Sequence, residues 1–415
     1  MTTDLTARSI APDLARGAML LLIAVANAPW YLWAGTTRGL SSHPVDGSAL
    51  DLVAQSIALV AIDGRTYPMF AFLFGYGIWQ LYSRQLAAGA DRRQARRLLR
   101  RRHWWMLAFG FVHAALLWMG DIVGAYGLAG LVLTWIFLDR RDTTLKVWAA
   151  IFTGLLGIIA AGSMLGGVLG VTLGGEADDL DLNANIAEDS YGLSVLWRIL
   201  SWVFLTPAQG LFGLIVPVAI LVAFLWARHR VLEEPRAHLP LLRRTAIVGI
   251  VAGWGVGAVV AAQNLDLLGV PSGLDYAFTG WHSLAGLLCG IGYVAVFGLI
   301  AARIEARAAT CGGSTGAAAA AGTKPEAVAG PGRVARALQA VGRRSLSMYL
   351  AQSLVFAPLM SAWGLGLGAH LSSWSILLVA VATWLLTVAL AVLLERRGIR
   401  GPAEWLLRRL AYPRG

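Results

Sequence analysis

Apolar runs close to twenty residues long recur along the whole chain, and this feature restricts its fold more than any other. A helix of about 20 residues crosses the ~30 Å hydrocarbon core of a bilayer. Only 14% of the 415 residues are charged, against about 25% in soluble domains. The sequence therefore predicts an all-α, polytopic transmembrane helical bundle of about ten spans. We expect these spans at 14–34, 66–84, 103–119, 121–138, 147–172, 205–227, 243–263, 280–302, 345–362 and 373–394.

The basic residues predict the orientation of the bundle. If both termini are cytoplasmic, every Lys and Arg lies in an inner segment except Arg38, Arg65 and Arg198. Such asymmetry follows the positive-inside rule. The net charge of +11 is then a topology signal, and we expect anionic membrane lipids rather than nucleic acid as its partners.

Three parts of the chain are expected. Residues 1–303 form an N-terminal bundle of about eight spans, 304–343 form a flexible cytoplasmic linker rich in Ala and Gly, and 344–415 form a two-span segment with an amphipathic tail. The two cysteines, Cys289 and Cys311, suggest neither a disulfide framework nor a metal site. We expect no metal cofactor.

His113 and Asp121 are the candidates for chemistry. His113 lies near the middle of the third span, and Asp121 follows eight residues later at the tip of a tight helical hairpin around Gly120. Ionisable groups inside a membrane are costly and indicate function. A carboxylate that orients an imidazole is a general-base arrangement. The alternatives are a buried structural histidine and a helix N-cap, the latter compatible with a functional role.

Further polar groups interrupt the apolar spans. Asn27 in the first span either bridges helices or contacts a ligand. Asn27 and Tyr126 are the two candidates for stabilising an oxyanion. Arg65 either holds an anionic group or pairs with Asp63, and Arg16 either binds an anion or pairs with Asp13. His43 in the first outer loop and His282 at the start of the eighth span either line an outer cavity or lie at the interface.

Several motifs resemble those of the YeiB-like family of bacterial inner-membrane proteins, and the resemblance extends almost from end to end. The matching segments are Asp13 to Gly17 with Asn27, Pro68 to Gly77, Phe109 to Gly127, Gly342 to Ser353 and Gly401 to Trp405. The fourth segment contains Arg343, Tyr349 and Gln352, which we take as site residues. His113, Asp121 and Tyr126 all belong to the third segment.

The YeiB-like family is grouped with heparan-α-glucosaminide N-acetyltransferase. That resemblance implies a transmembrane acyltransferase-like fold in a bacterial inner membrane, with acyl-CoA as donor substrate. The catalytic histidine of the heparan enzyme follows its first-span asparagine in an outer loop, and the residue at that place here is His43. His113 belongs to the YeiB-like signature itself, so we prefer it.

The sequence supports two functions. The first is transfer of an acyl group from a cytoplasmic acyl-CoA-type donor to an acceptor hydroxyl or amine in or across the membrane. His113 and Asp121 would act on the acceptor, Asn27, Arg65, Tyr126, His282, Tyr349 and Gln352 would bind it, and Arg16 and Arg343 would bind the donor phosphates. The alternative is a proton-coupled transporter, or a lipid- or metabolite-binding protein, without catalysis. Homo-oligomer formation stays open.

Overall fold

The computed structural model describes residues 10–37, 41–45, 47–172, 185–269, 274, 277–320 and 332–412, and within these ranges it is helical without strands. The all-α prediction is confirmed. The helices are α1 (Ile10–Asn27), α2 (Ala49–Ala61), α3 (Thr66–Ala87), α4 (Arg92–Leu116), α5 (Ile122–Phe137), α6 (Asp142–Thr172), α7 (Tyr191–Pro207), α8 (Ile215–Arg228), α9 (Leu239–Asn264), α10 (Thr279–Ala320), α11 (Arg333–Arg343), α12 (Ser345–Met360), α13 (Ser373–Arg396) and α14 (Pro402–Ala411).

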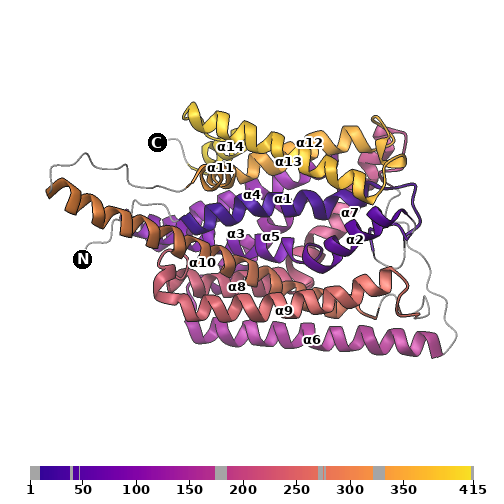
Figure 1. The fold of residues 1–415 in the computed structure, drawn as a ribbon, viewed down its shortest axis with the longest axis horizontal. Coiled ribbons are helices and arrows are strands. Elements are labelled where there is room, and N and C mark those ends of the chain that lie inside the picture. Colours follow the sequence, from indigo (N-terminus) through magenta and orange to yellow (C-terminus); the bar gives the residue numbers. More distant parts are fainter. Residues whose placement is uncertain are drawn as a thin grey trace.

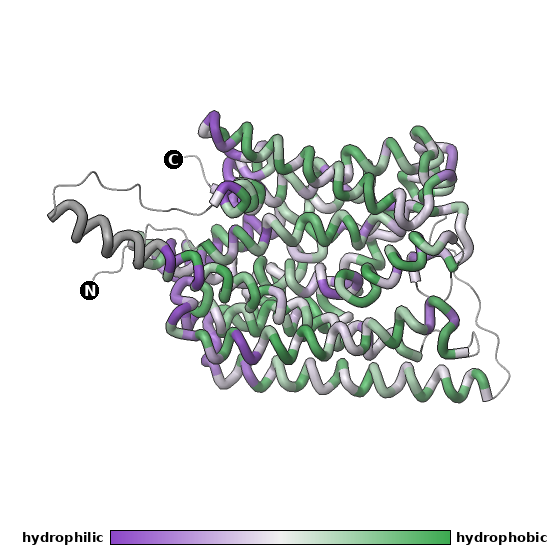
Figure 2. The backbone as a smooth tube through the Cα atoms, viewed as in Figure 1, coloured by the Kyte–Doolittle hydropathy of each residue, from purple (hydrophilic) through white to green (hydrophobic). Residues whose placement is uncertain are grey.

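The long helices run along one common direction (Figure 1). Within the described residues, seven helical segments are long and apolar enough to cross a membrane, and α5, α8 and α12 are shorter apolar helices. The protein is therefore a multi-pass membrane protein. Hydrophilic residues gather at one end of the bundle, near α11 and α14 (Figure 2); we call this the arginine-rich end.

The predicted span at 205–227 is interrupted in the structure. Helix α7 ends at Pro207, a π-helical turn covers Ala208–Phe212, and α8 begins at Ile215. Between them Leu214 has a φ of 60°, a left-handed conformation that non-glycine residues rarely adopt. The apolar composition is continuous across this break, so hydropathy alone could not locate it.

Helices also occupy parts of the predicted linker. Helix α10 continues to Ala320 and α11 covers Arg333–Arg343, whereas residues 321–331 lie outside the described residues. Helix α11 packs against α1 and α13. Gly17 of α1 and Gly342 of α11 permit this approach, because a Cβ atom at either position would lie within 2.1 Å of a backbone oxygen of the other helix. The division into three parts stays a prediction.

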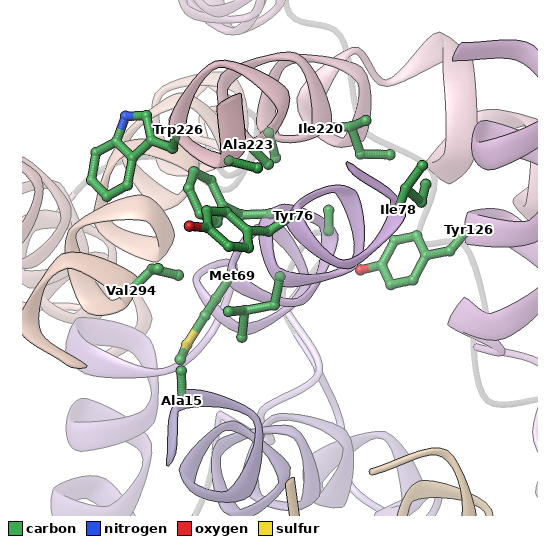
Figure 3. Close-up of a cluster of buried hydrophobic side chains, with 14 of the residues drawn as sticks. Ala15, Met69, Tyr76, Ile78, Tyr126, Ile220, Ala223, Trp226 and Val294 are labelled. Atoms are coloured by element: carbon green, nitrogen blue, oxygen red, sulfur yellow. The ribbon is translucent and has the colours of Figure 1, made fainter. Parts of the chain in front are cut away.

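Helix α3 passes through the centre of the core and contacts α1, α4, α5, α8 and α10. Its residues Met69, Phe72 and Tyr76 are buried, and Figure 3 shows Tyr76 beside Ala223 and Trp226. Gly75 of the predicted motif lies against α8, where an added Cβ would be 2.9 Å from the Cα of Ile220. Small residues thus let two helices pack closely.

Candidate active site

Helices α4 and α5 form the hairpin that holds the predicted His–Asp pair. Helix α4 ends at Leu116 and α5 begins at Ile122, so the connection is longer than the single Gly120 expected. Gly110 faces the start of α5, and a Cβ there would meet the backbone nitrogen of Gly124 at 2.2 Å. A glycine at this point therefore lets the C-terminal part of α4 touch the first turn of α5.

Asp121 performs two tasks with its two oxygens. Its Oδ2 accepts a 2.6 Å hydrogen bond from the backbone N–H of Gly124 and caps α5. Its Oδ1 lies 2.8 Å from Nδ1 of His113. Both side chains are buried. The predicted cap and the predicted orientation of the imidazole thus occur together.

The other imidazole nitrogen of His113 points to no protein partner. Nε2 is buried and has no hydrogen-bond partner among the described residues. The ring lies 5.3 Å from the ring of Tyr349 on α12, centroid to centroid. If Asp121 accepts the Nδ1 proton, Nε2 carries the lone pair and can accept a proton. The arrangement is that of an imidazole base held by a carboxylate.

Tyr126 lies one helical turn further along α5. Its hydroxyl donates to the backbone oxygen of Tyr67 at 2.7 Å, so the hydroxyl is already engaged. Its ring stacks on Phe70 at 5.0 Å and on Phe74 at 5.5 Å. Tyr126 therefore fixes the start of α3 against the α4–α5 hairpin.

A large cavity of about 1640 Å³ opens at the arginine-rich end. Arginines from separate segments line it, including Arg84, Arg102, Arg228, Arg343, Arg400 and Arg408. Its lining also includes Phe70, Met106 and Val123. Met106 lies two helical turns before His113 on α4, and Val123 lies two residues after Asp121. The cavity therefore approaches the His–Asp pair, although neither His113 nor Asp121 lines it.

Several carboxylates in the cavity are held by the protein itself. Glu233 accepts hydrogen bonds from the hydroxyl of Tyr76 and, at 2.6 Å, from Nε2 of Gln80. Glu404 accepts from the backbone N–H groups of Leu346 and Ser347 at 2.8 and 3.1 Å. Nine arginines and six carboxylates line the cavity, so its lining carries a net positive formal charge.

The two predicted phosphate-binding arginines both line this cavity. Arg16 on α1 donates to the backbone oxygen of Leu73 at 2.9 Å and lies 3.5 Å from Asp13. Arg343 at the end of α11 donates to Glu395 at 2.6 Å. The same glutamate also pairs at 2.5 Å with Arg344, a cavity residue that the sequence reasoning missed.

A second histidine–aspartate pair, with a buried histidine and a half-buried aspartate, lies near the opposite end of the bundle. Nε2 of His43 is 2.7 Å from Oδ2 of Asp63, and Nδ1 of His43 is buried without a partner among the described residues. The sequence predicts His43 as a candidate site residue, but it offers Arg65 rather than His43 as the partner of Asp63. The neighbouring positions 38–40 and 46 lie outside the described residues.

Arg65 joins this second pair. It is fully buried and donates to the backbone oxygens of Asp63 and, at 2.6 Å, of Gly253. One of its terminal nitrogens also lies 3.0 Å from Nε2 of His282. Arg65 and His282 are thus together, but at the His43–Asp63 pair rather than at His113.

Two predicted ligand-binding residues have other surroundings. Gln352 on α12 donates to the backbone oxygen of Leu20 at 3.1 Å and bridges two helices. Asn27 ends α1 before the turn Ala28–Tyr31, which it does not cap through its side chain. Among the described residues no three His, Cys, Asp or Glu side chains form a group that could hold a metal ion.

Comparisons with known proteins agree with the sequence motifs. Residues 226–414 match the model of a family described as "Protein of unknown function (DUF418)". The chain is 24% identical over 425 residues to the "Uncharacterized protein YeiB" of Escherichia coli (strain K12), over 97% of this chain and 96% of that protein. It is 23% identical over 380 residues to the "Uncharacterized protein YxaH" of Bacillus subtilis (strain 168), over 88% of this chain and 83% of that protein.

Proposed function

We propose that this chain, which is similar to YeiB over almost its whole length and to the DUF418 family over residues 226–414, is a transmembrane acyltransferase. It moves an acyl group from a cytoplasmic acyl-CoA-type donor to a hydroxyl or amine in or across the membrane. The observation that carries the proposal is the arginine-lined cavity that approaches a buried His–Asp pair. The bacterial inner membrane and the cytoplasmic position of the arginine-rich end belong to the same proposal.

The cavity suits the donor in size and charge. Ligand pockets commonly measure about 300–1,000 Å³, so about 1640 Å³ has room for a nucleotide with a long acyl-bearing arm. Arginine is well matched to phosphate groups because its guanidinium presents a planar fork of donors. The phosphates would lie at Arg84, Arg102 and Arg343, and the arm would reach toward Val123.

In the proposed reaction the base is Nε2 of His113, which has no partner among the described residues. Nε2 removes the proton from the acceptor hydroxyl or amine while the acceptor oxygen or nitrogen attacks the thioester carbonyl carbon. The tetrahedral intermediate then collapses, the carbon–sulfur bond breaks, and the leaving thiolate takes the proton back from His113. Asp121 keeps Nδ1 protonated and stabilises the transient imidazolium. A path from the cavity to His113 has to open for the thioester to reach it, because His113 does not line the cavity.

Turnover of radiolabelled acetyl-CoA by the full-length protein in liposomes tests this proposal. We expect thiol release and label transfer to a membrane-extract acceptor, with both lost by roughly 100-fold or more in His113→Gln, the usual scale for a general base. His229→Gln is the matched control, because His229 also pairs with an aspartate, Asp142, at 2.8 Å but is exposed. Wild-type turnover in His113→Gln would contradict the assignment.

The same assay decides between the two buried histidines. His43 pairs with Asp63, and no residue from 17 to 69 lines the cavity, whereas Val123, two residues after Asp121, does. We therefore expect His43→Gln to retain thiol release from the donor. Loss of turnover in His43→Gln together with activity in His113→Gln would move the reactive histidine to the second pair.

One observation favours proton-coupled transport as a second function. Two His–Asp pairs lie in a protein that crosses the membrane, a fully buried one at His113 and one at His43 whose aspartate is half-buried. Buried ionisable pairs in membrane proteins commonly carry protons. Acidification inside proteoliposomes on substrate-extract addition, without any acylated product, would support this function over acyl transfer.

A further inference from the structure

Arg198 on α7 is a buried cation beside the hairpin that carries His113. It is only 2% exposed and ranks among the largest fully buried side chains. Its Nε donates to the backbone oxygen of Ala115 at 3.0 Å, and one terminal nitrogen donates to Oγ of Ser194 at 2.6 Å. The second terminal nitrogen is buried and has no partner among the described residues. No described carboxylate forms an ion pair with Arg198.

An uncompensated buried charge is expensive. Burying a cation without a counter-charge costs free energy even after the protein relaxes around it. The Tyr191 and Trp363 rings lie 5.2 and 5.7 Å from the guanidinium carbon and offset part of that cost through cation–π contacts. They leave the free N–H groups of Arg198 without an acceptor.

Two further buried N–H donors lack partners, one on Trp363, whose ring contacts the Arg198 guanidinium, and one on Trp118, three residues after Ala115, whose backbone oxygen accepts from Arg198. The indole nitrogens of Trp118 and Trp363 are buried and have no hydrogen-bond partner among the described residues. Trp363 contacts Tyr191 at 4.9 Å, and the Tyr191 hydroxyl donates to the backbone oxygen of Leu116 at 3.0 Å. The backbone N–H of Trp118 donates to the oxygen of His113 at 3.2 Å. Trp363, through Tyr191, and Trp118, through the chain itself, are thus both linked to the end of α4.

We propose that Arg198, Trp118 and Trp363 form a binding subsite for a phosphate group on the acceptor substrate. A cation with surrounding N–H donors and no acceptor matches an oxygen-rich anion. The subsite is joined to the turn that carries His113, so a phosphate bound there would hold the rest of the acceptor beside the imidazole. The acceptor role rests on the proposed acyl transfer, whereas phosphate binding does not.

The position of α7 points to two sources of the phosphate. The outward face of this helix exposes Leu193, Leu196 and Leu200, as expected beside lipid. Arg198 lies on the buried face, at the end of the bundle away from the cavity mouth. The proposed phosphate belongs either to a lipid headgroup or to a free phosphate compound, and the test below separates the two.

Thermal unfolding of the full-length protein in neutral phosphatidylcholine nanodiscs provides the test. No thioester is present, so absence of acyl transfer would not affect the result. We expect inorganic phosphate, or phosphatidylglycerol in the nanodisc, to raise the unfolding temperature of the wild type. Arg198→Gln should lose the part of that shift that comes from Arg198 and keep the part that comes from the arginine-lined cavity, and Arg198→Lys should lose less of it. Arg397→Gln, which removes an exposed arginine, should behave as the wild type.

The outcomes separate the sources and can overturn the subsite. A shift with phosphatidylglycerol alone assigns a lipid headgroup, and a shift with inorganic phosphate assigns a free phosphate compound. A shift of full wild-type size in Arg198→Gln, or no wild-type shift with either probe, overturns the proposal. If Arg198→Gln does not fold, Trp363→Phe and Trp118→Phe should each weaken the shift, and unchanged shifts in both would overturn it.

An internal carboxylate is the rival occupant. Residues 173–184 lie outside the described residues and contain Glu176, Asp178, Asp179 and Asp181. If one of these pairs with Arg198, the wild type will show no phosphate shift, and a variant with all four changed to amides will gain one. That pattern would replace the phosphate by an internal ion pair.

Discussion

At the scale of single residues, Asp121 shows how one carboxylate can serve fold and site together. One oxygen caps α5 through Gly124, and the other orients His113. A capping residue is held in place by the helix it begins, so the oxygen aimed at His113 is fixed by the backbone. The orientation of the imidazole therefore depends on the backbone at the start of α5 rather than on contacts with distant side chains.

Substitutions at Asp121 should separate the two tasks. Asp121→Asn can still accept from Gly124 but offers no second negative oxygen to His113, so we expect a near-wild-type unfolding temperature with acyl transfer reduced by roughly 10²-fold or more. Asp121→Ala should lose the activity and also about 1 kcal/mol of stability. Acyl-CoA turnover and thermal unfolding, measured on the same samples, check both. Full activity in Asp121→Asn would remove the orienting role.

At the scale of helices, glycine decides how close α4 and α5 approach. An added Cβ at Gly110 would lie 2.3 Å from Oδ2 of Asp121 as well as near Gly124. Backbone atoms cannot yield as a flexible side chain does. The two helices would therefore separate, and the His113–Asp121 bond would lengthen.

Gly110→Ala should accordingly destabilise the protein by about 1–3 kcal/mol through overpacking and lower acyl transfer. Gly154→Ala on α6 is the control, because nothing lies within 4 Å of its added Cβ. Replacing that helical glycine should stabilise by about 0.5–1 kcal/mol. Unfolding in denaturant measures both variants, and equal stabilities would contradict the predicted close approach.

Helix α14 forms part of the cavity wall, and its Glu404 joins it to the start of α12. Glu404 accepts from the backbone N–H groups at the start of α12 and from the Ser347 hydroxyl. We expect Glu404→Ala to cost about 1–2 kcal/mol, as for loss of an N-cap, and to increase amide exchange at Leu346 and Ser347. Hydrogen-exchange mass spectrometry measures this, with Glu234→Ala, an exposed carboxylate in an i,i+4 pair, as control.

At the scale of the whole molecule, the charge asymmetry predicts which end faces the cytoplasm. The structure gathers the hydrophilic residues at one end of the helices (Figure 2). Under the positive-inside rule we expect this end to be cytoplasmic, and the cavity would then open toward the compartment that supplies the proposed donor.

Cysteine labelling on intact cells tests this orientation. In a background of Cys289→Ala and Cys311→Ala, we expect a membrane-impermeant maleimide to label Leu365→Cys but not Arg397→Cys. Leu365 is 69% exposed and lies between α12 and α13, and Arg397 follows α13 at the other end. Permeabilised cells should label both. The reverse pattern on intact cells would invert the topology and remove the cytoplasmic donor.

The sequence alone predicted the all-α membrane fold and the resemblance to YeiB-like proteins, whereas the importance of the hairpin stays a prediction. Hydropathy is a local property, and about 20 apolar residues suffice to identify a membrane helix. The motif around His113 and Asp121 is equally local. By contrast, the break at Leu214 depends on backbone conformation inside a continuous apolar run, and composition does not report it.

Only the tertiary structure decided which side chains meet. It brought His113 within 2.8 Å of Asp121, joined His43 to Asp63, and assigned Arg65 and His282 to that second pair. The cavity likewise combines α1 with α11, more than 300 residues later in the chain. Such contacts depend on the packing of helices against one another, a property that the spacing of residues along one helix does not contain.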